Sequence, residues 1–136
     1  YTFEAGTPNI SGVIGLGAAV DYLRGVGLEH ISDHEHRLHG YLVDRLTAID
    51  GIRLVGTAER QASVQSFNLG DIHPHDLGTI LDHQGVAVRT GHHCAMTVMQ
   101  HFGIPGTTRA SLGLYNNTDD IDQLIDGLRK AERLFS

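Results

Sequence analysis

The feature that most constrains the fold of this 136-residue chain is an amphipathic helical pattern over residues 118–134. Thr118 is a good helix-capping residue, and the acidic Asp119 and Asp120 follow it, where the helix dipole is positive. Basic residues gather at the other end. A helix that is apolar along one stripe has to bury that stripe against another layer. The stripe consists of Ile121, Leu124, Ile125, Leu128 and Leu134.

Helical and strand patterns alternate along the rest of the chain. A largely apolar helix, of a kind normally buried between other elements, begins after Asn9 or Ser11 and ends near Gly25 or Gly27. Further patterns predict helices over 28–49, 74–84 and 96–102, and short strands over 52–55, 63–69, 86–88 and 107–114. This order predicts an α+β fold in which helices cover a small, mainly antiparallel sheet.

Charge and composition exclude several classes of partner. The formal charge of −6, without a run of Lys or Arg, argues against a nucleic-acid surface. No apolar run approaches the length of a membrane span. The single cysteine, Cys94, cannot form an intramolecular disulfide, which favours a reducing, cytoplasmic location.

Cys94 lies in a stretch, residues 89–96, that reads RTGHHCAM. A thiol becomes a nucleophile when it loses its proton, and the nearby Arg89, His92 and His93 are groups that favour this loss. The alternative is an inert buried cysteine, but such residues usually sit in apolar runs. The pattern therefore predicts a loop thiol with nucleophilic character.

Arg109 is the second candidate, because it lies inside the predicted strand 107–114. An arginine within a strand is costly to place unless it faces a partner. Its planar guanidinium binds a carboxylate through two hydrogen bonds at once. The carboxylate could belong to a substrate or to a structural salt bridge, and the pattern alone favours neither.

Two other chemistries use the same histidines. A Cys–His catalytic pair would need a histidine distant in sequence, because adjacent residues seldom orient toward each other. A zinc site could use His92, His93, Cys94 and His101, but their spacing lacks the paired ligand modules typical of zinc. The residues by themselves thus predict a loop thiol that handles a carboxylate-bearing substrate, without naming a reaction.

The motifs around these residues resemble a known family. RTGHHCAM, followed by HFGIPGTTRASLGLYN and a helix ending in LRKAERLF, resembles the C-terminal part of group II (Suf-type) cysteine desulfurases, which are class V aminotransferases. FEAGTPNISGVIGLGAAVDYL and LDHQGVAVRTGHHC are similar to the same family. The resemblance covers nearly the whole chain, and its RxGHHCA and TRAS segments are specific to this branch.

The resemblance implies the small C-terminal domain of the aspartate-aminotransferase fold, fold type I of the pyridoxal-phosphate enzymes. Residues 28–136 would form this domain, and residues 1–27 would be an extended segment and a connecting helix from a large domain. Such enzymes are homodimers that convert L-cysteine to L-alanine. They form a persulfide on their own cysteine and pass the sulfur to an acceptor protein of the Suf system for iron–sulfur cluster assembly.

The resemblance also implies roles for individual residues. Cys94 matches the persulfide-forming nucleophile, and Arg109 matches the residue that binds the substrate carboxylate. Thr7 matches a position that hydrogen-bonds the cofactor phosphate across the dimer interface. His75 lies where some relatives engage a zinc-bearing sulfur acceptor. Support of the cysteine loop is expected from Arg89, His92 and His93.

One departure from the family concerns the cofactor. The family binds pyridoxal phosphate through a lysine, and the single lysine here, Lys130, lies in the final helix, far from any matching motif. Because the chain also begins at Tyr1 rather than at methionine, we expect a fragment that is inactive alone. The alternatives are a selenocysteine lyase, a non-enzymatic sulfur carrier that uses Cys94, and a zinc-binding domain.

Overall fold

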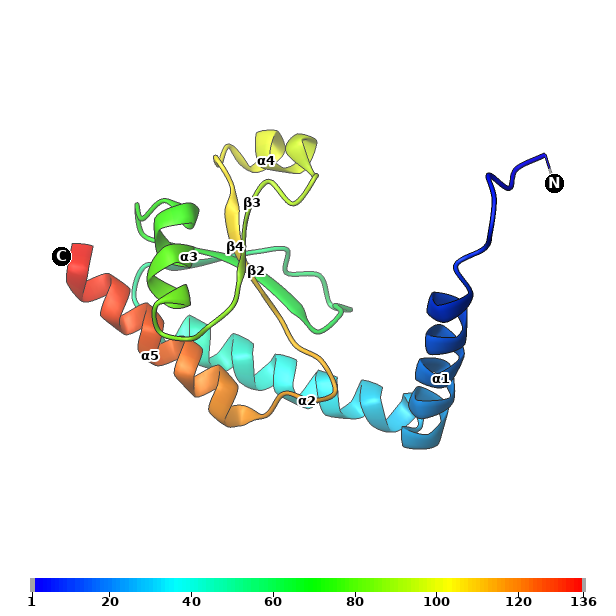
Figure 1. The fold of residues 1–136 in the computed structure, drawn as a ribbon. Coiled ribbons are helices and arrows are strands. Elements are labelled where there is room, and N and C mark those ends of the chain that lie inside the picture. The colour runs from blue at the N-terminus through cyan, green and yellow to red at the C-terminus, as the bar shows by residue number, and fades with distance from the viewer. Residues whose placement is uncertain (1, 136) are drawn as a thin grey trace. The chain divides into compact units, whose positions relative to one another are not determined.

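The computed structural model describes residues 2–135, and the chain divides into two compact units between His34 and Glu35 (Figure 1). Helix α2 (Leu28–Thr47) contains this division. The boundary between residues 27 and 28 that the resemblance implies therefore stays a prediction. No helix among the described residues is long and apolar enough to cross a membrane.

The first unit contains helix α1 (Ile10–Val26). As expected, Asn9 caps it, because its Oδ1 accepts a hydrogen bond of 3.0 Å from the Gly12 amide. Gly27, at φ 94°, ends it. None of its residues is buried within the described chain, so its burial between other elements stays a prediction. Apolar side chains are exposed on several sides, and Ile14 keeps 69% of its surface.

The second unit is built on a four-stranded antiparallel sheet, as predicted. Its strands lie in the order β1-β2-β4-β3. Each strand pairs antiparallel with its neighbour in that order. Their bounds are β1 Ile52–Val55, β2 Val64–Leu69, β3 Arg89–Gly91 and β4 Thr107–Ser111.

Along β2 the two faces of this sheet differ in burial. On β2, Gln65, Phe67 and Leu69 are buried on the face that we call the core face. Helices α2, α3 (Pro74–Asp82) and α5 (Thr118–Phe135) pack against it. Ser66 alternates with these residues and so lies on the other face, the open face. The core side chains include Leu42, Leu46, Phe67, Leu77, Leu81, Ile121, Ile125 and Leu128, each at most 1% exposed.

The C-terminal helix differs from its prediction at both ends. Asn117, rather than Thr118, caps α5: its Oδ1 accepts from the amides of Asp119 at 2.7 Å and Asp120 at 3.3 Å. The Asp120 carboxylate accepts in return from the Asn117 amide at 3.0 Å, which completes a capping box. Leu134 was expected in the buried stripe but is 64% exposed, because the core ends one turn earlier at Ala131.

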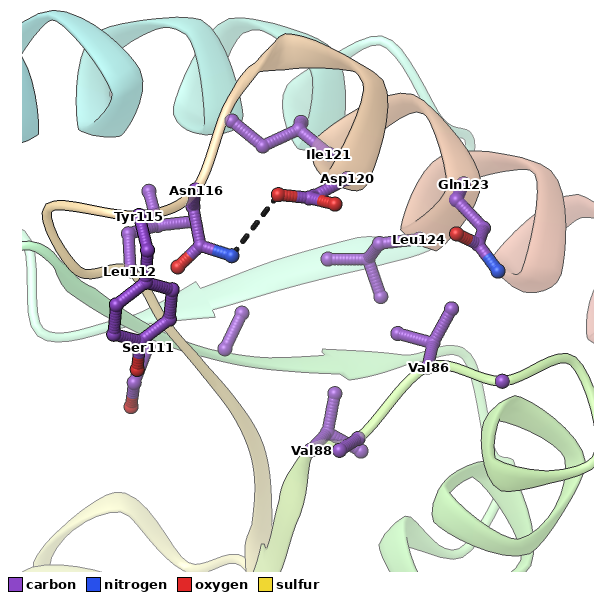
Figure 2. Close-up of a pocket in the computed structure, with 13 residues that line it drawn as sticks. Val86, Val88, Ser111, Leu112, Tyr115, Asn116, Asp120, Ile121, Gln123 and Leu124 are labelled. Carbon is purple, nitrogen blue, oxygen red and sulfur yellow. Dashed lines mark hydrogen bonds between the residues drawn. The ribbon is translucent and has the colours of Figure 1, made fainter.

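The third strand also lies later than predicted. Residues 86–88 form no strand, and β3 instead spans Arg89–Gly91. Val86 and Val88 are half-buried, so the apolar run does indicate burial, but a pocket lies between residues 86–88 and residues 110–112 (Figure 2). The pocket separates the two segments where a longer β3–β4 ladder would otherwise form. Arg89 is therefore a strand residue rather than the start of a loop.

Candidate functional site

Cys94 lies in a tight turn between β3 and the short helix α4 (Met96–Phe102). The Ala95 amide donates to the His92 carbonyl oxygen at 2.9 Å, which closes the turn. Its two central residues, His93 and Cys94, have φ angles of 54° and 59°. Two positive φ angles are the pattern of a type I′ turn, which Asn and Gly usually occupy. For other residues the left-handed conformation costs roughly 1–2 kcal/mol each.

The thiol of Cys94 is exposed, which overturns the alternative of an inert buried cysteine. Arg89, on β3, places Nη2 3.9 Å from the Cys94 Sγ. The turn therefore presents an accessible sulfur beside the guanidinium of Arg89.

The His93 ring contacts β4. Its Nε2 lies 2.9 Å from Thr107 Oγ1 and 3.2 Å from the Thr107 carbonyl oxygen. The tautomer with a proton on Nε2 accounts for both contacts, because a carbonyl oxygen can only accept. Thr107 is completely buried. The other ring nitrogen, Nδ1, is buried without a hydrogen-bond partner.

Burial lowers the pKa of His93 below its usual value of 6.5. The positive charges of Arg109 and Arg89 lower this pKa further, as does His92, while the hydrogen bond to the Thr107 carbonyl acts in the opposite direction. The imidazole of His93 is therefore mainly neutral at pH 7. A neutral ring keeps Nδ1 as a bare acceptor and avoids a buried N–H without a partner.

Arg109 lies on the open face of the sheet. It pairs with Arg89 of β3 on one side and with Ser66 of β2 on the other, and directly paired residues share a face. Among residues 2–135, no carboxylate forms an ion pair with Arg109. Its Nε is buried without a hydrogen-bond partner. The structural salt bridge that the sequence left open is therefore absent from the described chain.

The other three predicted residues lie in the cysteine turn, on helix α3 and in the first unit. His92 is exposed in the cysteine turn. His75 is exposed in the first turn of α3, where its amide donates to His73 Nδ1 at 3.2 Å. Thr7 lies in an exposed bend before α1, in the first unit.

Sequence reasoning missed two polar residues near the arginine. Thr107 contacts His93, and Asn68 of β2 donates to the Gly106 carbonyl at 3.1 Å while its Oδ1 is buried without a partner. Strand alternation gave a signal for Thr107, because it places Thr107 and Arg109 on one face. Asn68 gave a similar signal, since it alternates with the buried Phe67.

The residues present do not fit a Schiff-base cofactor by themselves. Lys130, the single lysine, is exposed on α5 and donates to Gln84 Oε1 at 3.0 Å. Helix α5 packs against the core face of the sheet, whereas Arg109 lies on the open face. The amine of Lys130 is therefore not available beside Cys94. In the described range, no group of three His, Cys, Asp or Glu side chains could hold a metal ion either.

Comparison with known proteins gives these residues a context. A protein named probable cysteine desulfurase from Streptomyces coelicolor is 51% identical over 99% of this chain and 33% of its own length. A second protein of that name, from Halalkalibacterium halodurans, is 48% identical over 99% of this chain and 33% of its own length. The chain thus spans about a third of the length of the curated relatives it matches.

Solved structures agree with the fold. The apo cysteine desulfurase of Thermococcus onnurineus matches with a TM-score of 0.89 and 40% identity over 95% of this chain and 32% of its own. The Escherichia coli cysteine desulfurase CsdA, in an S-sulfonic acid form, matches with a TM-score of 0.89 and 33% identity over 98% of this chain and 33% of its own. The predicted fold, that of the small domain of the fold-type-I enzymes, is confirmed.

The family assignment rests on a match that spans most of the sequence. The model of the class-V aminotransferases matches residues 1–124. This range includes the turn of Cys94, the strand of Arg109 and the first turn of α5. The chain therefore belongs to the class-V aminotransferase family.

Proposed function

We propose that this chain is the thiol-bearing part of a Suf-type cysteine desulfurase. The observation that carries the proposal is an exposed thiol beside Arg89, whose strand partner Arg109 has no carboxylate partner among residues 2–135. An unpaired guanidinium on an open sheet face is suited to a ligand carboxylate. The names of the relatives support cysteine as the amino acid that carries it.

Cys94 acts as the nucleophile in this proposal. Its sulfur attacks the sulfur of L-cysteine, so a sulfur–sulfur bond forms and the substrate's carbon–sulfur bond breaks. The carbon keeps the electron pair and takes up a proton, which yields L-alanine. Thiol and L-cysteine are thereby converted to persulfide and L-alanine, with all atoms and electrons accounted for.

Arg109 binds and orients the substrate carboxylate. Its planar guanidinium can donate two parallel hydrogen bonds, and Nε already lacks a partner within the described chain. The pairing of Arg109 with Arg89 places two positive charges side by side on the sheet. An incoming carboxylate relieves their mutual repulsion, which adds to its attraction for this face.

This chain can supply only part of the cofactor's site, because its single lysine, Lys130, lies on α5. We propose pyridoxal phosphate, which stabilises negative charge on the substrate carbon when it is bound, with its lysine supplied by another part of the enzyme. Thr7 would contribute a hydrogen bond to the phosphate in a homodimer. The chain alone is then inactive, because its single lysine is engaged on α5.

The sulfur on Cys94 passes to an acceptor protein for iron–sulfur cluster assembly in the cytoplasm. His75 is proposed to contact that acceptor, since it is exposed in the first turn of α3. His75→Ala should lower acceptor-stimulated turnover and leave turnover without acceptor unchanged. Equal stimulation of variant and wild type would remove His75 from the proposal.

The test uses a complete enzyme that contains this chain. Its visible spectrum is recorded, and alanine release from L-cysteine is measured for wild type and Cys94→Ala. A yellow protein whose alanine release is lost in Cys94→Ala supports the proposal. A colourless protein that takes up sulfur on Cys94 without releasing alanine would indicate a sulfur carrier. Retained release from selenocysteine in Cys94→Ala would indicate a selenocysteine lyase.

A further inference from the structure

The turn that presents Cys94 is held in a conformation that its own residues disfavour. His93 and Cys94 both have positive φ angles, and neither is glycine or asparagine. One backbone hydrogen bond, from Ala95 to His92, closes the turn. A two-residue turn of this kind opens readily unless contacts outside it favour the closed form.

The contact outside the turn comes from His93. Its Nε2 reaches Thr107 Oγ1 at 2.9 Å and the Thr107 carbonyl oxygen at 3.2 Å, fourteen residues along the chain. Thr107 is fully buried and pairs with Gly91 in the β3–β4 ladder. The ring is therefore attached to a buried residue of the β3–β4 ladder.

The two adjacent histidines differ in this respect. His92 is exposed, whereas the His93 ring is partly buried and its Nδ1 is fully buried. Because Cys94 follows His93 directly, fixing the His93 ring and backbone also fixes the direction of the Cα–Cβ bond of Cys94. With this backbone, Sγ lies 3.9 Å from Arg89 Nη2.

We propose that His93 is a positioning residue for the Cys94 thiol, and that its contact with Thr107 keeps the cysteine turn closed. The inference rests on the proposed function for its consequence, because a fixed sulfur matters only if Cys94 is the nucleophile. The contact itself can be tested without any turnover. It assigns His93 no contact with substrate or cofactor.

Hydrogen exchange of the Ala95 amide tests the contact directly, because this amide closes the turn. Exchange is measured by NMR on this 136-residue chain, with the Phe67 amide in the centre of the sheet as a report of global unfolding. We expect His93→Ala to lower Ala95 protection about fivefold, the effect of one lost hydrogen bond on an opening equilibrium. Protection of Phe67 stays unchanged.

Matched variants separate the contact from backbone preference. Asn tolerates positive φ but is too short to replace Nε2, so His93→Asn should lose protection as His93→Ala does. His93→Gln carries an amide nitrogen near the Nε2 position and should retain the protection of the Ala95 amide. Thr107→Val removes only the hydroxyl and should lose part of the protection. His36→Ala, at an exposed site on α2, is the control and should match wild type.

Three results would overturn the inference. Ala95 protection could be unchanged in His93→Ala, His93→Asn could protect as well as wild type, or His93→Gln could be as weak as His93→Ala. In a complete enzyme with the proposed activity, His93→Ala should lower kcat about fivefold with KM little changed, and His93→Gln should restore most of it. Lost protection without any alanine release in wild type would support the contact and refute the proposed function instead.

Discussion

Replacement of Arg109 by methionine should stabilise the second unit while it removes the carboxylate site. Arg109 pairs directly with Arg89, and like charges opposite each other on a sheet cost roughly 0.2–1 kcal/mol. Its Nε is buried without a partner, and an unsatisfied buried group costs roughly 1–3 kcal/mol. Methionine keeps an unbranched apolar side chain but removes both the repulsion from Arg89 and the unsatisfied Nε. After allowance for the partial exposure of Arg109, we expect a gain of about 1 kcal/mol.

Urea denaturation of the chain, followed by circular dichroism, measures this gain as a shift of the midpoint at constant slope. The matched control is Arg53→Met, on β1, because Arg53 lies on the same face but is exposed. We expect the control to stay within about 0.5 kcal/mol of wild type. A loss of stability of about 1 kcal/mol or more in Arg109→Met would refute the reasoning, because it would show that Arg109 holds the fold together.

Three further predictions concern separate parts of the second unit. Because the pKa of His93 is lowered in the folded chain, this imidazole binds a proton more readily when the chain is unfolded. The stability that His93 contributes is therefore complete above pH 6.5, and it decreases as the pH falls through the folded-state pKa. The difference in stability between wild type and His93→Gln should follow that direction, since Arg109, Arg89 and His92 all oppose the added charge. Asn117→Ala should destabilise the chain by about 1 kcal/mol in urea, because α5 loses its cap. Gly106→Ala should lower the free energy of unfolding by about 1–3 kcal/mol and disturb the cysteine turn, because a Cβ there would lie 3.1 Å from the Gly91 carbonyl oxygen. Unchanged stability of this variant would contradict the close approach of β3 and β4.

Local patterns predicted the elements that depend on local chemistry. The pattern over residues 63–69 predicted a strand where β2 forms, and the short polar stretch around Cys94 indicated an exposed thiol. The cap of α5 was misplaced by one residue, because Asn117 and Thr118 are both good caps and only the backbone decides between them.

The features that could not be predicted from the sequence depend on strand register. The apolar residues 86–88 indicated burial correctly, but no local signal shows that β4 diverges from them at the pocket. The contact between His93 and Thr107 joins residues fourteen apart and follows from the pairing of Gly91 with Thr107. That Arg109 forms no ion pair within the described part of the chain likewise appears only once every neighbouring element is in place.

We propose that Cys94 accepts sulfur from L-cysteine. The most direct measurement is mass spectrometry of the peptide that contains Cys94, after a complete enzyme with this chain has been incubated with L-cysteine and quenched by alkylation. We expect one added sulfur atom on Cys94, formed in equal amount with the first alanine released, and neither product in Cys94→Ser. Alanine release at the wild-type rate with no sulfur on Cys94 would contradict it.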